Sequence, residues 1–155
     1  MKLIEQAKAP NPRRVRIFLA EKGIEVASAP VDIMAREHKT EAFAKLNPFH
    51  QIPVLVLDDG TAISESVAIC RYFEELHPEP VLMGKTPLEK ARVEMWQRRM
   101  EFGLLGAVAA VFRHSHPAMA PIEVPQVAAW ADVNRPRVAD TLKLLDAELA
   151  GRAFV

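Results

Sequence analysis

The pair Glu65-Ser66 combines a carboxylate with a hydroxyl at the predicted start of a helix. Free N–H groups at a helix N-terminus attract a carboxylate, and the helix dipole adds to that attraction. Glu65 supplies the opposite charge, which suits an ammonium group. Together the two residues could bind the end of an α-amino acid, which carries both charged groups on one carbon. The alternative is a plain helix cap, made by Ser66 or Ser64, with an acidic first turn.

A second candidate is Ile52-Pro53, at the start of the apolar run 54–57. Proline cannot donate to a strand ladder, and an X–Pro bond loses most of the usual preference for trans. A cis bond here would turn the N–H and C=O of Ile52 out of the sheet. These groups could then bind the peptide groups of a small ligand, as an added strand does. An ordinary trans turn proline is the alternative interpretation.

The elements that must position these residues alternate between strand and helix patterns. Strands are predicted at 2–5, 24–32, 53–59 and 61–64, and helices at 9–23, 40–47 and 64–77. Asn11 is expected to cap the helix 9–23, with Pro12 at its first position and Gly23 after its end. Asp59-Gly60 indicates a hairpin. A helix between two strands implies a parallel pair, so the order predicts a small mixed sheet with helices packed against it.

The second half of the chain has no strand pattern. Apolar residues at helical spacing predict a long helix over 88–114 and another over 126–150, which Pro136 should kink or break. The segment between the two halves is rich in Pro and Gly. The sequence therefore predicts two domains, 1–77 and 88–155, joined by a linker over 78–87.

Composition limits the class of protein. The 155 residues contain 20 Lys plus Arg and 20 Asp plus Glu, which argues against a nucleic-acid or anionic-membrane surface. The lone Cys70 allows no internal disulfide and no CxxC metal or redox pair, and we expect it to pack in the core. The N-terminus lacks a signal peptide, and the apolar stretch 104–112 is too short to span a bilayer. We expect a soluble cytoplasmic protein in a reducing compartment, without a metal.

The segments RRVRIFLAEKGIE, NPFHQIPVL and ISESVAICRYFEE resemble, in order and spacing, the N-terminal half of a glutathione transferase. The resemblance is strong to Leu76 and continues more weakly through the later helices. It implies an α/β thioredoxin-like domain with a mixed four-stranded sheet in the order βαβαββα, followed by an all-α domain. It also implies glutathione as co-substrate, a homodimer and a role in detoxification.

The same resemblance implies which residues bind glutathione. Ile52 would bond the cysteinyl backbone beside a cis Pro53, and Glu65 with Ser66 would hold the γ-glutamyl end. His50 occupies a position that in some relatives reaches the glycine carboxylate, and His38 and Lys39 lie where other members place a similar cationic contact. Solvated surface histidines are the alternative for His50 and His38. The full set is His38, Lys39, His50, Gln51, Ile52, Pro53, Glu65 and Ser66.

The residue that activates the thiol is missing from its usual place. A transferase must lower the pKa of a bound thiol, and many family members use a Tyr or Ser hydroxyl after the first strand. Here that region reads IEQAKAPNP and contains no hydroxyl or thiol. The substitutes are the Asn11 amide with the helix N-terminus, Lys8, or His114, Ser115 and His116 in FRHSHPAM. A surface lysine, a simple Asn11 cap and a solvated helix end are the alternatives.

The chain ends where the family's helical domain usually continues, which implies either a fragment or a shortened member with exposed apolar helix faces. The expected function is conjugation of the glutathione thiolate to a small apolar electrophile held around Trp96, Met100 and Phe112. Two rivals stay open. One is a glutathione-dependent disulfide reductase, and the other is a non-catalytic binding or scaffold protein of the same fold.

Overall fold

The computed structural model describes residues 1–152 of the chain. The chain forms two compact units, Met1–Met83 and Gly84–Val155. The boundary lies inside the segment 78–87, and the predicted domain ranges 1–77 and 88–155 stay predictions.

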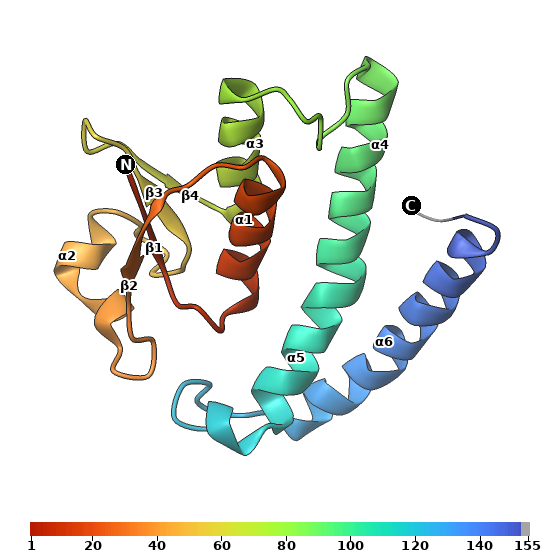
Figure 1. Ribbon diagram of the computed structural model, residues 1–155. Coiled ribbons are helices and arrows are strands. Elements are labelled where there is room, and N and C mark those ends of the chain that lie inside the picture. Colours follow the sequence, from red (N-terminus) through yellow and green to blue (C-terminus); the bar gives the residue numbers. More distant parts are fainter. Residues whose placement is uncertain (153–155) are drawn as a thin grey trace. The chain divides into compact units, whose positions relative to one another are not determined.

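The first unit is a four-stranded mixed sheet with helices packed against it (Figure 1). Its strands are β1 (Lys2–Glu5), β2 (Ala27–Pro30), β3 (Val54–Val56) and β4 (Ala62–Ser64), and its helices are α1 (Pro10–Glu21), the short α2 (Glu41–Ala44) and α3 (Ser66–Leu76). The strand order is β2-β1-β3-β4, with β1 and β2 parallel and the other pairs antiparallel. The predicted thioredoxin-like fold class is confirmed.

Local sequence signals explain most of these elements. Pro30 lies in the edge strand β2, where its missing N–H does no harm. Gly60 turns the β3–β4 hairpin with a φ of +88°, a conformation that glycine adopts without strain. The start of α1 differs from the prediction, because Ala9 is the N-cap and Pro10 the first helical residue. Asn11 is therefore not the cap, since the fixed φ of Pro10 already begins the helix before it.

The core of the first unit is formed by apolar side chains one helical turn apart. Val15 and Leu19 on α1 meet Ile69 and Phe73 on α3 above the sheet. Cys70 is buried beside them, as predicted, and burial raises the pKa of its thiol to about 11. Leu76, the last residue of α3, lies outside this core and is 49% exposed.

A buried ion pair ties the end of the first unit to its helices. The Lys22 ammonium lies 2.7 Å from a Glu74 carboxylate oxygen, and the Lys22 side chain is fully buried. The second Glu74 oxygen accepts two backbone N–H groups, and the ammonium donates to two backbone carbonyls. These groups belong to Leu82 and Met83, and to His77 and Pro80. Each charge is thus paired and hydrogen-bonded, the condition for burying it without a large penalty.

The second unit is helical. It contains α4 (Pro87–Arg98), a π-helical segment (Arg99–Leu105), α5 (Gly106–Ser115) and α6 (Ala128–Leu149). The predicted helix 88–114 is therefore three consecutive segments, with a π-helical middle that contains Gly103. Pro136 lies inside α6 without ending it, so of the predicted kink or break the break does not occur. None of the helices formed by residues 1–152 combines the length and apolar character that a membrane span requires.

Candidate functional site

The strand pairings bring the predicted binding segments to one edge of the sheet. Glu5 pairs with Pro30, so the parallel strands β1 and β2 end together. Val54, the first residue of β3, pairs with Ile4 on one side and with the last residue of β4 on the other. The ends of β1, β2 and β4 and the start of β3 therefore meet. The chain segments that enter or leave the sheet at this edge carry the candidate residues of the first unit.

Ile52 lies just outside the ladder. The last pair of β3 is Val54 with Ile4, and Ile52 precedes it by two residues. The Ile52-Pro53 bond is cis, as the family resemblance implied, and Pro53 is buried. The backbone groups of Ile52 thus sit at the open edge of the sheet, where an extended ligand could bind them.

A buried asparagine that the sequence analysis missed shapes the loop before Ile52. Asn47 is 1% exposed, and its side-chain amide donates to the carbonyl of Gln51 at 2.9 Å. Its side-chain oxygen accepts the N–H of Phe49 at 3.1 Å. These bonds fix the loop from inside and leave the Gln51 side chain exposed. The available signal was an Asn before Pro in a turn, which is typical of such local hydrogen bonds.

Glu65 and Ser66 follow β4 directly. Glu65 is the N-cap of α3, with a φ of 68° and a ψ of 117°, and its side chain is exposed. A positive φ in a residue other than glycine is strained, and such residues cluster at functional sites. Ser66 is the first residue of α3 and Ser64 ends β4, so the predicted cap by either serine is wrong. The Ser66 hydroxyl is buried and instead accepts a hydrogen bond from Arg14 at 2.9 Å.

His38 and His50 are neighbours. The Nδ1 of His50 lies 2.8 Å from the backbone carbonyl oxygen of His38, and a carbonyl can only accept, so this nitrogen carries the hydrogen. His38 is 8% exposed, so the prediction of a solvated surface histidine is wrong for it. No hydrogen-bond partner for the Nδ1 of His38 lies among residues 1–152. A buried polar atom without a partner is rare and is a candidate ligand contact.

Charge around these histidines is positive. Burial lowers the pKa of His38 below its ordinary value, and the charges of Lys39, His50 and Arg36 lower it further. His38 is therefore neutral at neutral pH. Lys39 and Arg36 are both exposed, so each offers a positive charge at this part of the edge.

Asn11 is the second residue of α1 and is exposed. Pro10 and Pro12 on either side of it have no N–H, and the N–H of Arg13 already bonds to the Ala9 carbonyl at 3.2 Å. The N–H of Asn11 has no carbonyl four residues earlier within the helix. The first turn of α1 therefore offers one backbone donor and one side-chain amide, both from Asn11, to an acceptor.

His114 and Ser115 lie at the C-terminal end of α5 in the second unit, and both have partners there. The Nδ1 of His114 accepts the N–H of Val127 at 3.2 Å, and its Nε2 is 3.8 Å from a Glu123 carboxylate oxygen. The Ser115 hydroxyl donates to the carbonyl of Val111 at 2.7 Å. These contacts hold the turn that follows α5.

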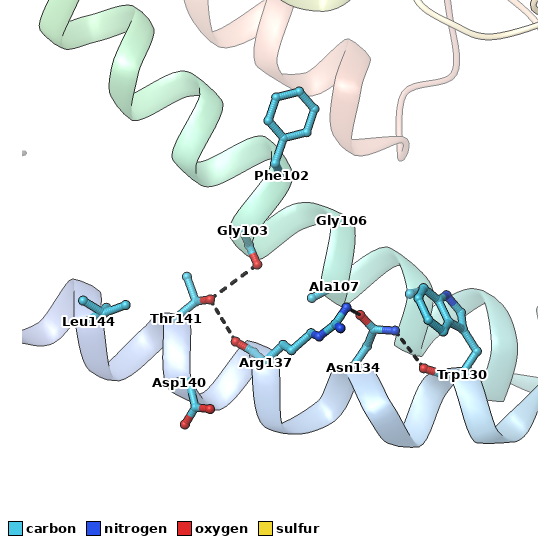
Figure 2. Close-up of a pocket in the computed structure, with 11 residues that line it drawn as sticks. Phe102, Gly103, Gly106, Ala107, Trp130, Asn134, Arg137, Asp140, Thr141 and Leu144 are labelled. Carbon is cyan, nitrogen blue, oxygen red and sulfur yellow. Dashed lines mark hydrogen bonds between the residues drawn. The ribbon is translucent and has the colours of Figure 1, made fainter.

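The second unit contains an open pocket of about 540 Å³ between α6 and the segment formed by the π-helical turns and α5 (Figure 2). Phe102 and Trp130 supply aromatic surface to it. Arg137 places its guanidinium 5.9 Å from the Trp130 ring and donates to the Asn134 side chain at 3.4 Å. Trp96, Met100 and Phe112, expected around the acceptor, do not line this pocket.

Comparison with known proteins places this architecture in one family. The family model described as glutathione S-transferase, N-terminal domain, matches residues 9–76. The curated protein Glutathione S-transferase 2 of Saccharomyces cerevisiae is 37% identical over 158 residues, covering all of this chain and 68% of that protein. The maleylacetoacetate isomerase of Pseudomonas aeruginosa is 39% identical over 94 residues, covering 59% of this chain and 44% of that protein.

A solved structure agrees with these matches. The glutathione S-transferase domain-containing protein of Marinobacter aquaeolei superposes with a TM-score of 0.91 at 40% identity, over 97% of this chain and 75% of that one. Similarity over the whole of this chain to a curated transferase, together with the fold and the family-model match, leads to one conclusion. The chain belongs to the glutathione S-transferase family.

Proposed function

We propose that the protein is a glutathione transferase that conjugates the glutathione thiolate to a small apolar electrophile. The thiolate sulfur forms a bond to an electrophilic carbon, whose leaving group departs with the bonding electrons, while the thiol proton passes to solvent. The observation that carries this proposal is the pairing of Val54 with Ser64. It brings the Ile52 backbone and the Glu65-Ser66 pair to the same end of one hairpin.

Each part of glutathione then has a chemically suitable partner. The exposed Glu65 carboxylate suits the γ-glutamyl ammonium, and the Ser66 hydroxyl at the start of α3 suits the α-carboxylate. The Ile52 backbone suits the cysteinyl peptide groups. The glycine carboxylate would lie toward Lys39, His50 and the unpartnered nitrogen of His38. His38 would contribute a hydrogen bond rather than a charge, since it is neutral.

Thiol activation is assigned to Asn11. Its backbone N–H and side-chain amide are the free donors of the first turn of α1, where the helix dipole also favours a negative sulfur. His114 and Ser115 stay a second prediction, in which they act directly or through a water molecule. Their internal hydrogen bonds make Asn11 the first choice.

A second candidate function is favoured by the similarity to the maleylacetoacetate isomerase of Pseudomonas aeruginosa. In such an isomerisation the thiolate adds to a conjugated double bond, the resulting single bond rotates, and elimination returns the thiolate. The same site would serve both reactions, because each needs an activated glutathione sulfur. Turnover of a chlorinated aromatic, a small disulfide and a cis-dienoic acid, measured side by side, separates transferase, reductase and isomerase.

The proposal is tested by titrating the ultraviolet thiolate band of bound glutathione with pH. We expect the pKa of the bound thiol to lie below about 8.5, the value of a free thiol. In Asn11→Ala it should rise by about 1 to 2 units, because a hydrogen bond to a charged group is lost. Lys8→Gln tests the other candidate activator before this helix, and it should leave the pKa unchanged if Asn11 activates the thiol.

The same titration on His114→Ala tests the competing assignment of the activating role to His114. A rise confined to this variant would move the activating role to His114. A bound thiol that keeps the pKa of free glutathione in the unmodified protein would instead support the non-catalytic scaffold. The same proposal includes a cytoplasmic homodimer that acts in detoxification, which sedimentation and cell fractionation would check.

A further inference from the structure

Arg14 makes a polar contact at the candidate site but has no role in the glutathione binding proposed above. It lies on α1 three residues after Asn11, so the two side chains share a face of the helix. Its guanidinium crosses to the start of α3, where Nη1 lies 2.9 Å from the Ser66 hydroxyl oxygen. The bond joins the two helices that carry the proposed thiol contact and the proposed γ-glutamyl contact.

The direction of this hydrogen bond is fixed by chemistry. A guanidinium has only donors, so the Ser66 oxygen must accept. The hydrogen of the Ser66 hydroxyl is then directed away from Arg14 and is available to a further acceptor. No acceptor among residues 1–152 receives it, although Ser66 is only 6% exposed. A buried donor without a partner is costly, so the site is suited to a ligand that brings an acceptor.

The charge of Arg14 points to the same kind of ligand. No carboxylate of the described residues forms an ion pair with it, and it lies at the N-terminal end of α3, where the helix dipole is also positive. Its charge reaches Cys70, one turn into α3, although burial dominates there and raises the pKa of that thiol. The Arg14 charge and the positive end of the α3 dipole act at the same place, so an anion is favoured there.

We propose that Arg14 is a positioning residue for the α-carboxylate of the γ-glutamyl group. It holds the Ser66 hydroxyl so that it donates to the carboxylate, and it adds a positive charge beside that carboxylate. This inference rests on the proposed function, because it assumes that glutathione binds with its γ-glutamyl end at Glu65-Ser66.

The test is a calorimetric cycle with two ligands. Glutathione is compared with 4-aminobutanoyl-cysteinyl-glycine, which lacks only the α-carboxylate, on the unmodified chain and on Arg14→Met. Arg14→Met should raise the Kd for glutathione about 10- to 100-fold and leave the Kd for the analogue unchanged. Arg14→Gln keeps a donor without the charge. Its Kd for glutathione should lie between those of the unmodified chain and Arg14→Met. The exposed neighbour Arg13→Met is the matched control and should change neither value.

The outcomes separate the two proposals. If Arg14→Met raises the Kd of both ligands equally, or of neither, the proposed role of Arg14 is overturned, while glutathione binding itself is retained. If the unmodified chain binds no glutathione, the proposed function fails and this inference fails with it. Melting curves of both variants show whether the fold is retained, and Arg14→Gln carries the comparison if Arg14→Met does not fold.

Discussion

Replacing Glu74 with Gln should lower the free energy of unfolding by about 3–5 kcal/mol, because it leaves the Lys22 ammonium buried without its counter-charge. Lys22 is fully buried and cannot turn its charge toward water. The remaining backbone contacts of Lys22 are neutral carbonyls, which do not replace a carboxylate. Urea denaturation of the two proteins measures the difference.

Two variants control this result. Glu75→Gln removes the same charge from the exposed neighbouring position and should change the free energy of unfolding by less than about 0.5 kcal/mol. The double variant Lys22→Met/Glu74→Leu removes both charges and should recover part of the loss, because no charge is left unpaired. An equal loss in Glu74→Gln and Glu75→Gln would contradict the buried pair.

The same pair gives a pH dependence with a definite sign. Burial alone would raise the pKa of Glu74, but hydrogen bonds from Lys22, Met83 and Leu82 outweigh it and hold the pKa below the ordinary 4.5. A lowered folded-state pKa means that the contribution to stability is complete above about pH 4.5 and is lost as the pH falls through the folded-state value. Glu74→Gln should lack this acid-dependent loss.

Replacing Glu65 with Gly should have opposite effects on stability and on binding. Its φ of 68° strains any residue other than glycine, so the substitution should raise the free energy of unfolding by about 1 kcal/mol. The same substitution removes the carboxylate proposed for the γ-glutamyl ammonium. Glutathione affinity should fall about 10- to 100-fold, the loss expected for a hydrogen bond to a charged group. Thermal melting and calorimetry measure the two effects.

Glu65→Gln separates strain from charge. It keeps a side chain at the strained backbone position, so it should lower the affinity for glutathione without stabilising the fold. Glutaryl-cysteinyl-glycine, which lacks only the α-amino group, should bind equally to the unmodified chain and to Glu65→Gln. If this analogue loses as much affinity as glutathione does, Glu65 does not pair with the ammonium.

Much of the fold could be predicted because its signals are local. Asp59-Gly60 specifies a hairpin by its turn chemistry, and Pro30 marks an edge strand by its missing donor. The start of α1 was predicted two residues late, since Pro10 and Pro12 both suit a first helical turn. The π-helical segment 99–105 has no sequence signal that distinguishes it from the α-helix on either side.

The sequence indicates the segments that carry the candidate site. It does not indicate the side-chain hydrogen bonds that hold these segments in place. Ile52 and Glu65 follow from a turn proline and a helix start that lie 13 residues apart in the sequence. The Arg14–Ser66 bond joins residues 52 positions apart, and nothing in either segment indicates the other. The burial of Asn47 has no sequence signal of its own, because a buried asparagine and an exposed turn asparagine have the same local pattern.

The central claim is that glutathione binds along the edge of the sheet where β3 begins and β4 ends. The direct test is a nuclear magnetic resonance titration of the ¹⁵N-labelled chain with glutathione. We expect the largest amide shift changes at Ile52, Glu65 and Ser66, with Asn11 responding to the thiol. Saturable binding that leaves these four amides unmoved, or no binding at millimolar glutathione, would contradict the claim.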